Sequence, residues 1–318
     1  MGERLHNVAV WLFNKPGQID LDATMSLKLG LHPRITDRSL DLLDTARAVE
    51  ERGLDGIFFP EHTHVPVHYD RNSYPGMKRG IPMPEFYKRV LDPYVASSFV
   101  AAATGLEVGT IISLVAQHDP IVLAKNIATI DFLSKGRFVF GVGFGWSPDE
   151  FAQHSRVPFG ERMDLAREKV AVLKAIWSSE EGAFQGRHVT LQPTWSWPKP
   201  AQRPHPPILL GGRATEANYG RICEWADGWI PQEAGFLAKP GSLAQLGRLR
   251  ALWRDAGRAT DGPRVTVMIE AVPARDELAR QLARAVEWGV ERIVINVGDL
   301  PQAELNRILD NAASARPS

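Results

Sequence analysis

The sequence has a single cysteine and no surplus of charge of either sign. Cys223 stands alone among 318 residues, so an internal disulfide and a cysteine-ligated metal cluster are both excluded. The 37 Lys and Arg residues are balanced by 37 Asp and Glu residues. This neutral balance argues against nucleic acid, or an anionic membrane surface, as the main partner.

Long apolar runs are absent as well. No stretch is long enough to span a bilayer, and the polar start at 1–7 has no apolar signal segment. We therefore expect a soluble cytoplasmic protein. Hydrophobic residues make up 44% of the chain, which is enough for the core of one large barrel or of two medium domains.

Apolar strand-like runs alternate with helix-like segments along the whole chain. We predict strands at 8–13, 56–59, 107–113, 137–142, 207–210, 228–230, 265–269 and 292–297. Helices are expected at 37–52, 95–104, 162–177, 276–288 and 302–313, and one more between Asp119–Pro120 and Gly136. Eight alternating strands predict an α/β fold of the (β/α)8 barrel type, with an open doubly wound sheet as the alternative.

Two long stretches do not fit this alternation. Residues 61–89 follow the second predicted strand, and residues 181–206 lie between the fourth predicted helix and the fifth strand. Long loops in a compact domain are usually functional or disordered, and these two are too aromatic for disorder. We expect both at the mouth of the barrel, where they would set substrate specificity.

Two glycine-rich turns follow predicted strands. Gly143 and Gly145 come directly after the strand at 137–142, at the end where α/β folds place their active sites. The turn Gly211–Gly212–Arg213 ends the fifth strand and opens a helix, which predicts an anion site. Together they suggest a phosphate-bearing cofactor across the barrel mouth, although each could also be only a tight turn.

The segment Glu61–His62–Thr63–His64 follows the second strand directly. His62 could donate a hydrogen bond to a cofactor or carry a proton, with Glu61 orienting it. Alternate histidines in extended chain face the same way, so a metal site is a competing interpretation, as is a purely structural His62. His64 fits a loop hydrogen-bonder, and His118 faces either the pocket or solvent.

These blocks together resemble the luciferase-like monooxygenase superfamily, and within it the actinobacterial-type oxidoreductases that use the deazaflavin coenzyme F420. The resemblance extends over nearly the whole chain. It is carried, in order, by Phe59–Pro66, Tyr87–Pro93, Asp131–Phe138, Gly141–Trp146, Trp195–Pro207, Gly211–Gly212 and Ala226–Trp229.

The resemblance implies one barrel domain over 1–318, with an insertion that residues 181–206 fit. It implies a cofactor at the carboxyl end of the barrel, catalytic roles for His62 and Glu61, and a non-prolyl cis peptide at Ile111–Ile112. It places the cofactor against His62, Ile111, Ile112, Gly143, Trp146, Gly211, Gly212 and Arg213. It also implies a homodimer. A metal ion is not expected, because no other acidic or His cluster lies at the predicted strand ends to complete a site.

One residue departs from the family pattern. Trp146 stands where the F420-using sugar-phosphate dehydrogenases of this superfamily have a glutamate, which puts that activity in doubt. The favoured function is an F420-dependent oxidoreductase in which Glu61 tunes His62. The alternatives are an FMN-dependent two-component monooxygenase, a non-catalytic flavin-binding protein and, outside the superfamily, a metal-dependent barrel hydrolase.

Overall fold

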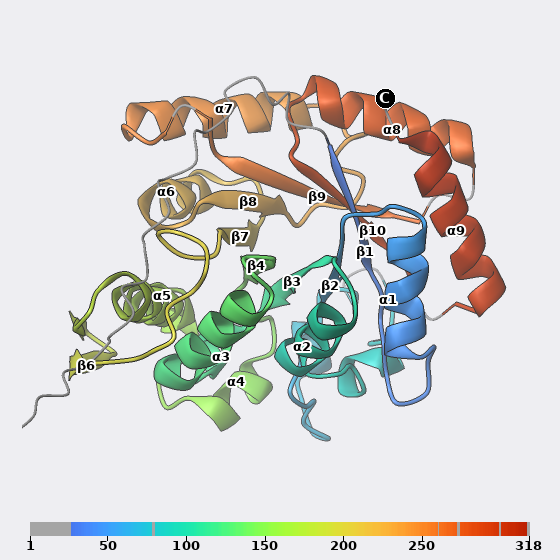
Figure 1. Cartoon of the computed structure of the whole chain (residues 1–318). Helices are drawn as coiled ribbons and strands as arrows, with labels where there is room; N and C mark the ends of the chain where they lie inside the picture. The colour runs from blue at the N-terminus through green and yellow to red at the C-terminus, as the bar shows by residue number, and fades with distance from the viewer. Residues whose placement is uncertain (1–26, 78–79, 260, 272–273, 299, 317–318) are drawn as a thin grey trace, which may run out of the picture.

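Eight parallel strands close into a barrel with helices around its outside (Figure 1). The computed structural model describes residues 27–77, 80–259, 261–271, 274–298 and 300–316. The barrel strands are β1 (Lys28–His32), β2 (Gly56–Phe59), β3 (Glu107–Ser113), β4 (Phe138–Val142), β7 (Ile208–Gly212), β8 (Gly228–Pro231), β9 (Arg264–Glu270) and β10 (Arg292–Asn296). Because β1 pairs with both β2 and β10, the sheet has no free edge. The predicted (β/α)8 barrel is confirmed, and the open sheet is excluded.

The helices cover the outer surface of the barrel. They are α1 (Leu42–Glu51), α2 (Pro93–Ala103), α3 (Pro120–Leu133), α4 (Pro148–His154), α5 (Arg162–Ser178), α6 (Glu216–Trp225), α7 (Ser242–Asp255), α8 (Arg275–Glu287) and α9 (Gln302–Ala315). The predicted start of α3 is confirmed, because the Asp119 carboxylate accepts hydrogen bonds from the N–H groups of Ile121 and Val122. No helix in the described ranges is long and apolar enough to cross a membrane.

Two predicted elements at the start of the chain need correction. The strand predicted at 8–13 lies outside the described residues, and the first barrel strand is β1. Its short alternation of Leu29 and Leu31 with Gly30 is a weaker signal than an unbroken apolar run. Helix α1 begins at Leu42 rather than at residue 37, because Asp41 accepts from the Leu43 and Asp44 N–H groups and caps the helix there.

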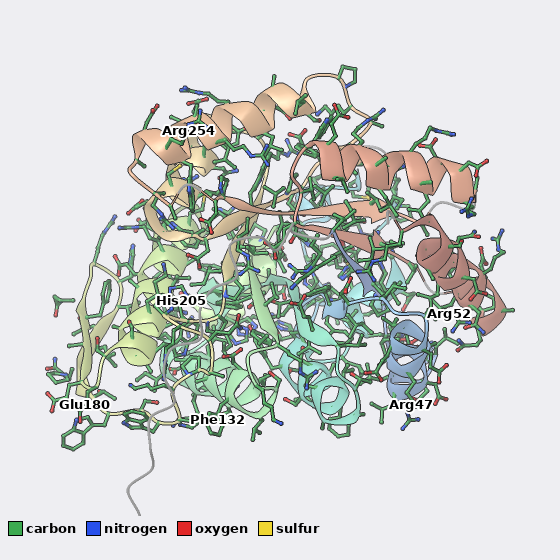
Figure 2. All side chains as sticks on the ribbon, turned by 45° about the horizontal axis from the view of Figure 1, so that its top comes forward. Arg47, Arg52, Phe132, Glu180, His205 and Arg254 are labelled. Atoms are coloured by element: carbon green, nitrogen blue, oxygen red, sulfur yellow. The ribbon has the colours of Figure 1, made fainter. Side chains whose placement is uncertain are left out.

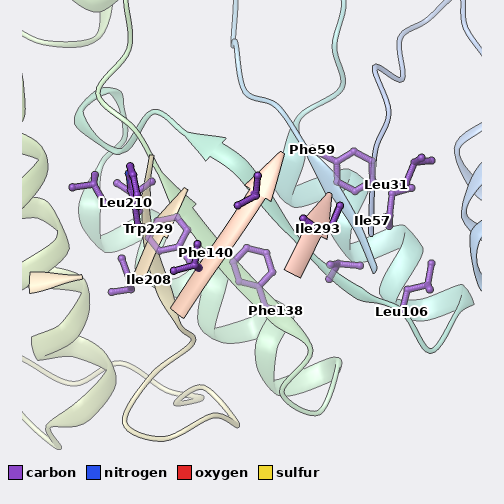
Figure 3. Close-up of a cluster of buried hydrophobic side chains, with 14 of the residues drawn as sticks. Leu31, Ile57, Phe59, Leu106, Phe138, Phe140, Ile208, Leu210, Trp229 and Ile293 are labelled. Carbon is purple, nitrogen blue, oxygen red and sulfur yellow. The ribbon is translucent and has the colours of Figure 1, made fainter. Parts of the chain in front are cut away.

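The strands have a period of two, so each barrel strand faces both inward and outward. Inward-facing side chains fill the barrel centre: Phe58, Ile111, Val139, Leu209, Ile230 and Val294. Their outward-facing neighbours pack against the helices, as Figure 3 shows for Ile57, Phe59, Phe138, Phe140, Ile208 and Leu210. Burial of each such side chain contributes about 1.5–3 kcal/mol. The barrel is therefore a packed core rather than a pore.

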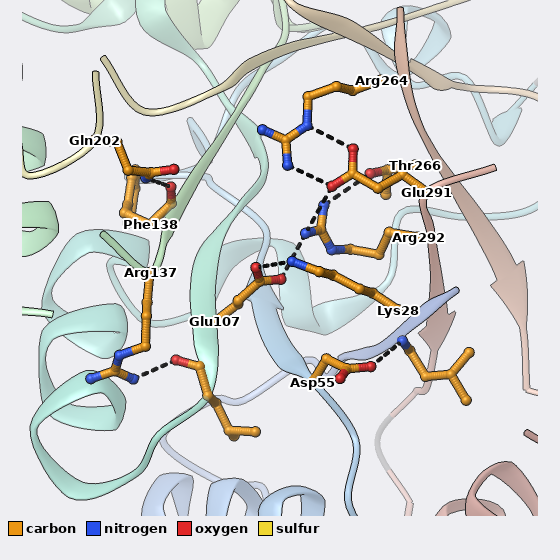
Figure 4. A network of polar contacts seen from close by, with 12 residues as sticks. Lys28, Asp55, Glu107, Arg137, Phe138, Gln202, Arg264, Thr266, Glu291 and Arg292 are labelled. Atoms are coloured by element: carbon orange, nitrogen blue, oxygen red, sulfur yellow. Dashed lines mark hydrogen bonds and ion pairs between the residues drawn. The ribbon is translucent and has the colours of Figure 1, made fainter. Parts of the chain in front are cut away.

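Charged side chains close the amino-terminal end of the barrel (Figure 4). Arg292, the first residue of β10, lies 2.7 Å from the Glu107 carboxylate, which also accepts from Lys28 at 2.5 Å. Glu291 pairs with Arg264 at 2.6 Å and with Arg292 at 3.5 Å. This network leaves the opposite, carboxyl-terminal end as the place for a ligand site.

The stretch at 181–206 forms the predicted insertion between α5 and β7. It contains the antiparallel strands β5 (Gly182–Gln185) and β6 (Thr190–Thr194), which pack outside α5. The Glu168 carboxylate of α5 anchors the hairpin turn by accepting hydrogen bonds from three backbone N–H groups at 187–189. Farther along, the Gln202 amide donates to the Phe138 carbonyl at the start of β4.

Candidate active site

The carboxyl ends of the barrel strands open into a cleft of about 430 Å³. The loop at 61–89 contributes to its wall, as predicted. No described residue of the insertion at 181–206 lines it, so the expectation of a second mouth loop is wrong. The physical reason is the order of the elements: a segment that follows a helix and precedes a strand enters the barrel at its amino-terminal end. The lining includes His32, Arg34, His62, Tyr87, Ile111, Ile112, Trp146, Arg162, Gly212, Arg213 and Asn296.

His62 is held in the cleft wall by a carboxylate from another loop. Its Nδ1 lies 3.0 Å from Oε2 and 3.2 Å from Oε1 of Glu150, a buried residue of α4. Ser147 and Pro148 start this helix, and the Ser147 hydroxyl accepts from the Glu150 N–H. Because the carboxylate accepts the Nδ1 proton, Nε2 is the ring nitrogen left for a ligand. It has no hydrogen-bond partner among the described residues.

Glu61 does not contact His62 as expected; it binds residues behind the cleft wall. One carboxylate oxygen accepts from the Leu114 N–H at 2.5 Å, and the other lies 2.6 Å from Nε2 of His118. Burial would raise the pKa of Glu61, but the contact with His118 and the hydrogen bonds from Leu114 and Ser113 together hold that pKa below its usual value. Burial likewise opposes protonation of His118, yet Glu61 keeps the pKa of His118 above its usual value. The two residues form a charged pair.

This pair settles the orientation that the sequence left open for His118. The His118 ring does not line the cleft. It contacts the carboxylate of Glu61, and Glu61 is a residue of the cleft lining. The Lys169 ammonium donates to the carbonyls of Ala116 and His118, and burial lowers the pKa of Lys169 to about 8. These contacts fix the loop after β3 from outside the site.

Aromatic rings surround His62. The Tyr87 ring centroid lies 4.9 Å from that of His62, and Trp146 lies 5.7 Å away. Tyr74 contacts both of these neighbours edge-on. Burial raises the pKa of Tyr87, so its hydroxyl stays neutral. The Trp146 indole N–H is buried and has no hydrogen-bond partner in the described part of the chain. This wall keeps water away from one side of the imidazole.

The Ile111–Ile112 peptide is cis, as the resemblance predicted. Both residues line the cleft, and the pairing of β3 with β4 is irregular beside them. Gly143 and Gly211, both predicted to contact cofactor, do not line the cleft. A β-carbon at Gly143 would lie 2.0 Å from Cδ1 of Ile112, and one at Gly211 would lie 3.0 Å from Cγ2. These glycines make room for the Ile112 side chain.

The turn after β7 places Gly212 and Arg213 in the cleft wall. The Gly212 carbonyl accepts from Trp229 Nε1 and from the Gln232 N–H, at 2.9 and 3.1 Å. The Asn218 side chain donates to the Arg213 carbonyl at 2.9 Å. The sequence suggested that this glycine turn opens the next helix. Helix α6 begins only at Glu216, however, so both glycines precede the helix. These hydrogen bonds hold the turn, and the Arg213 side chain is exposed.

The charge of the lining fits an anionic, phosphate-bearing ring cofactor. Three guanidinium groups reach the cleft, from Arg34, Arg162 and Arg213, whereas the lining carboxylate of Glu61 is already paired. Cleft volumes of this size are usual for cofactor sites, which combine apolar walls with few polar groups. Among the described residues, no group of three or more His, Cys, Asp or Glu could hold a metal ion.

Sequence reasoning missed several residues of the site. Glu150 was the most important: Ser147–Pro148 followed by an acidic residue is a helix-start signature, but it does not show that the carboxylate turns toward His62. Arg34 was missed together with β1, the strand it follows. His64 matches its predicted role, because its Nδ1 lies 3.0 Å from the Thr63 hydroxyl.

Comparisons with known proteins identify the relatives of this chain. Residues 22–316 match the family described as luciferase-like monooxygenase. The uncharacterized protein Rv0953c of Mycobacterium tuberculosis is 38% identical over 267 residues, which cover 83% of this chain and 89% of that protein. Among solved structures, the monooxygenase RslO1 from Streptomyces bottropensis has a TM-score of 0.68 at 20% identity, covering 91% of this chain and 98% of its own. That likeness shows a shared fold.

The names of two further relatives specify different cofactors. An F420-dependent glucose-6-phosphate dehydrogenase of Kineococcus radiotolerans is 28% identical over 191 residues, which cover 59% of this chain and 51% of that protein. An FMNH(2)-dependent dimethylsulfone monooxygenase of Pseudomonas putida is 33% identical over 135 residues, covering 41% of this chain and 37% of that enzyme. Both similarities span about half of the relative or less.

Proposed function

Because the chain belongs to the luciferase-like monooxygenase family, we propose that it is an F420-dependent oxidoreductase that transfers a hydride between the deazaflavin and a small organic substrate. Members of this family are oxidoreductases or monooxygenases that use F420 or FMN, and the chain is an enzyme of this kind. The observation that carries the proposal is the pair His62–Glu150, which leaves one imidazole nitrogen directed at the cleft.

Bound F420 supplies the carbon that accepts or releases the hydride. The chain supplies the proton that must move with it: reduction of a carbonyl needs a proton at the oxygen, and oxidation of an alcohol needs one removed. Nε2 of His62 would carry out this exchange, because Glu150 holds Nδ1 and would stabilise the ring when it is protonated. Tyr87 and Trp146 exclude water beside the ring.

The cofactor would lie between two parts of the cleft. Gly212 and Arg213 would hold its phosphate, since Arg213 is exposed and the turn exposes backbone to the cleft. Ile111 and Ile112 would support the ring opposite His62. Glu61 would act by fixing Leu114 after β3 rather than by tuning His62.

An FMN-dependent monooxygenase is the second candidate, favoured by the similarity to the dimethylsulfone enzyme. The same cleft would take either cofactor, since both carry a tricyclic ring and a phosphate. A non-catalytic flavin-binding protein is the third candidate, and the fixed His62 argues against it.

The test is a pair of turnover screens with one panel of aldehydes and ketones. With reduced F420 and no oxygen, the proposal predicts carbonyl-dependent oxidation of the cofactor. Oxygen-dependent product formation with reduced FMN, and none with F420, would instead support the monooxygenase. Binding without turnover of either cofactor would support the non-catalytic protein.

An exposed apolar surface supports a homodimer. On α2 it contains Val95 and Phe99, and on α3 it contains Ile121, Val122, Phe132 and Leu133, all of them at least 45% exposed. The two helices lie side by side (Figure 1), and Phe132 lies at the outer edge of the molecule (Figure 2). Exposed apolar side chains gathered on two neighbouring helices are typical of an interface. We infer that a second copy of the chain covers it.

A further inference from the structure

Two polar residues at the end of β1 line the cleft apart from the groups assigned above. His32 is the last residue of β1, and Arg34 follows two positions later. In extended chain, side chains two residues apart point to the same side. Both therefore reach the cleft from the β1 side, whereas Gly212 and Arg213 reach it from the end of β7.

Arg34 has hydrogen-bond donors to spare. Its guanidinium lies 4.1 Å from the centroid of the Phe86 ring, which covers one face of the group. In the described part of the chain it makes no ion pair and donates no hydrogen bond. Stacking on a ring leaves the in-plane N–H groups free, and that edge is the one that binds carboxylates and phosphates in a bidentate manner.

His32 offers an acceptor beside this donor. Its Nδ1 lies 2.9 Å from the Phe58 carbonyl, which can only accept, so Nδ1 carries the proton. Burial lowers the pKa of His32 to about 4, so the ring is neutral near pH 7. Nε2 is then an acceptor, and no described residue donates to it although the side chain is more than nine-tenths buried.

We propose that Arg34 and His32 form a substrate subsite for a small organic oxyanion, a carboxylate or a phosphate ester, that carries a hydroxyl or N–H group next to its anionic end. The oxyanion would accept from Arg34, and the neighbouring hydroxyl would donate to Nε2 of His32. The proposal rests on the proposed function for the reaction that follows binding, but the binding itself can be measured without the cofactor.

The experiment titrates four probes into the full chain, with and without F420, by isothermal calorimetry at low ionic strength. Lactate carries a carboxylate and a hydroxyl, propionate only the carboxylate, glycerol 3-phosphate a phosphate and hydroxyls, and glycerol no anion. We expect lactate or glycerol 3-phosphate to bind, propionate to bind more weakly than lactate, and glycerol not to bind. Which oxyanion binds distinguishes a carboxylate from a phosphate substrate.

Variants assign the binding to the two residues. Arg34→Met should lower the affinity for the oxyanion roughly ten- to a hundredfold, and Arg34→Lys should lower that affinity less. His32→Leu should remove the preference for lactate over propionate. Arg213→Met is the matched control, because it should lower the affinity for F420 and leave the affinities for the probes unchanged. Melting curves of each variant show that it is folded.

Four results would overturn the subsite: no oxyanion binds the wild-type chain, glycerol binds as tightly as the oxyanion that does bind, lactate binds but no more tightly than propionate, or Arg34→Met leaves the probe affinities unchanged. Loss of F420 affinity in Arg34→Met, equal to that in Arg213→Met, would assign Arg34 to the cofactor and also overturn it. If the probes bind as expected but F420 does not bind, the subsite stands and the proposed F420 function fails.

Discussion

Nδ1 of His62 lies 3.0 Å from the carboxylate of Glu150, a residue 88 positions farther along the chain. The two come from different strand-end loops, after β2 and after β4, and the barrel brings them together. A buried carboxylate against one nitrogen of a histidine fixes the tautomer and directs the other nitrogen at the ligand. The pair therefore leaves Nε2 as the atom of His62 that would act on a ligand in the cleft.

Loss of the imidazole should affect turnover more than folding. His62→Ala should lower the rate by about 10²–10⁴-fold, the usual contribution of a positioned proton donor. Glu150→Gln keeps the size of the side chain but not its charge, so we expect a smaller loss of rate. Turnover and melting temperature are measured together, with His64→Ala as the control. A large fall in melting temperature with unchanged activity per folded molecule would make His62 structural.

The turn after β7 should hold the cofactor phosphate. A β-carbon at Gly212 would lie 2.8 Å from the Asn218 amide nitrogen, which donates to the Arg213 carbonyl, so Gly212→Val should distort the turn. Arg213→Ala removes only a charge-assisted contact and should weaken cofactor binding by roughly 1–3 kcal/mol. Fluorescence titration with F420 measures both. Normal affinity in Gly212→Val would place the phosphate elsewhere.

The Glu61–His118 pair should stabilise the fold over a defined pH range. The raised pKa of His118 means that its contribution is complete below pH 6.5 and is lost as the pH rises through that raised value. The lowered pKa of Glu61 means that its contribution is complete above pH 4.5 and is lost as the pH falls through that lowered value.

Glu61→Gln should therefore lower the free energy of unfolding most between pH 4.5 and pH 6.5. The loss should be about 3 kcal/mol, because the substitution breaks a buried charged pair. Urea unfolding of the variant and the wild type across this range measures the difference. A difference that does not change with pH would show that the pair is not charged.

The apolar surface of α2 and α3 should be a dimer interface. The double variant Phe132→Glu with Leu133→Glu places two carboxylates on this surface. We expect it to be a monomer, because a dimer would have to bury these charges. Leu243→Glu is the control, since Leu243 is exposed on a different helix, α7. Light scattering at micromolar concentration gives the mass. A wild-type monomer, or a dimer of the double variant, would contradict the proposed interface.

Seven of the eight barrel strands could be predicted because their apolar runs are short and bounded. The strand β1 was missed, since Lys28, Gly30 and His32 interrupt it and a stronger apolar run precedes it at 8–13. Because β1 was not predicted, Arg34, which follows this strand, was not predicted as a site residue either. Local patterns show strands best where burial on both faces makes them continuously apolar.

The site was only partly predictable. His62, Trp146, Gly212 and Arg213 do reach the cleft, because each lies at the carboxyl end of a barrel strand or just after it. The partner of His62 was assigned wrongly to Glu61, its neighbour in sequence. Adjacent residues in extended chain point to opposite sides, and the carboxylate that faces His62 comes from another loop. Such a contact depends on tertiary structure and has no local signature.

The central claim is that this cleft binds F420. Equilibrium dialysis of the full chain against F420 and against FMN, in separate experiments at the same ionic strength, tests it most directly. We expect saturable binding of F420 that is tighter than that of FMN and is weakened by Arg213→Ala. Binding of FMN at least as tight as that of F420 would contradict it.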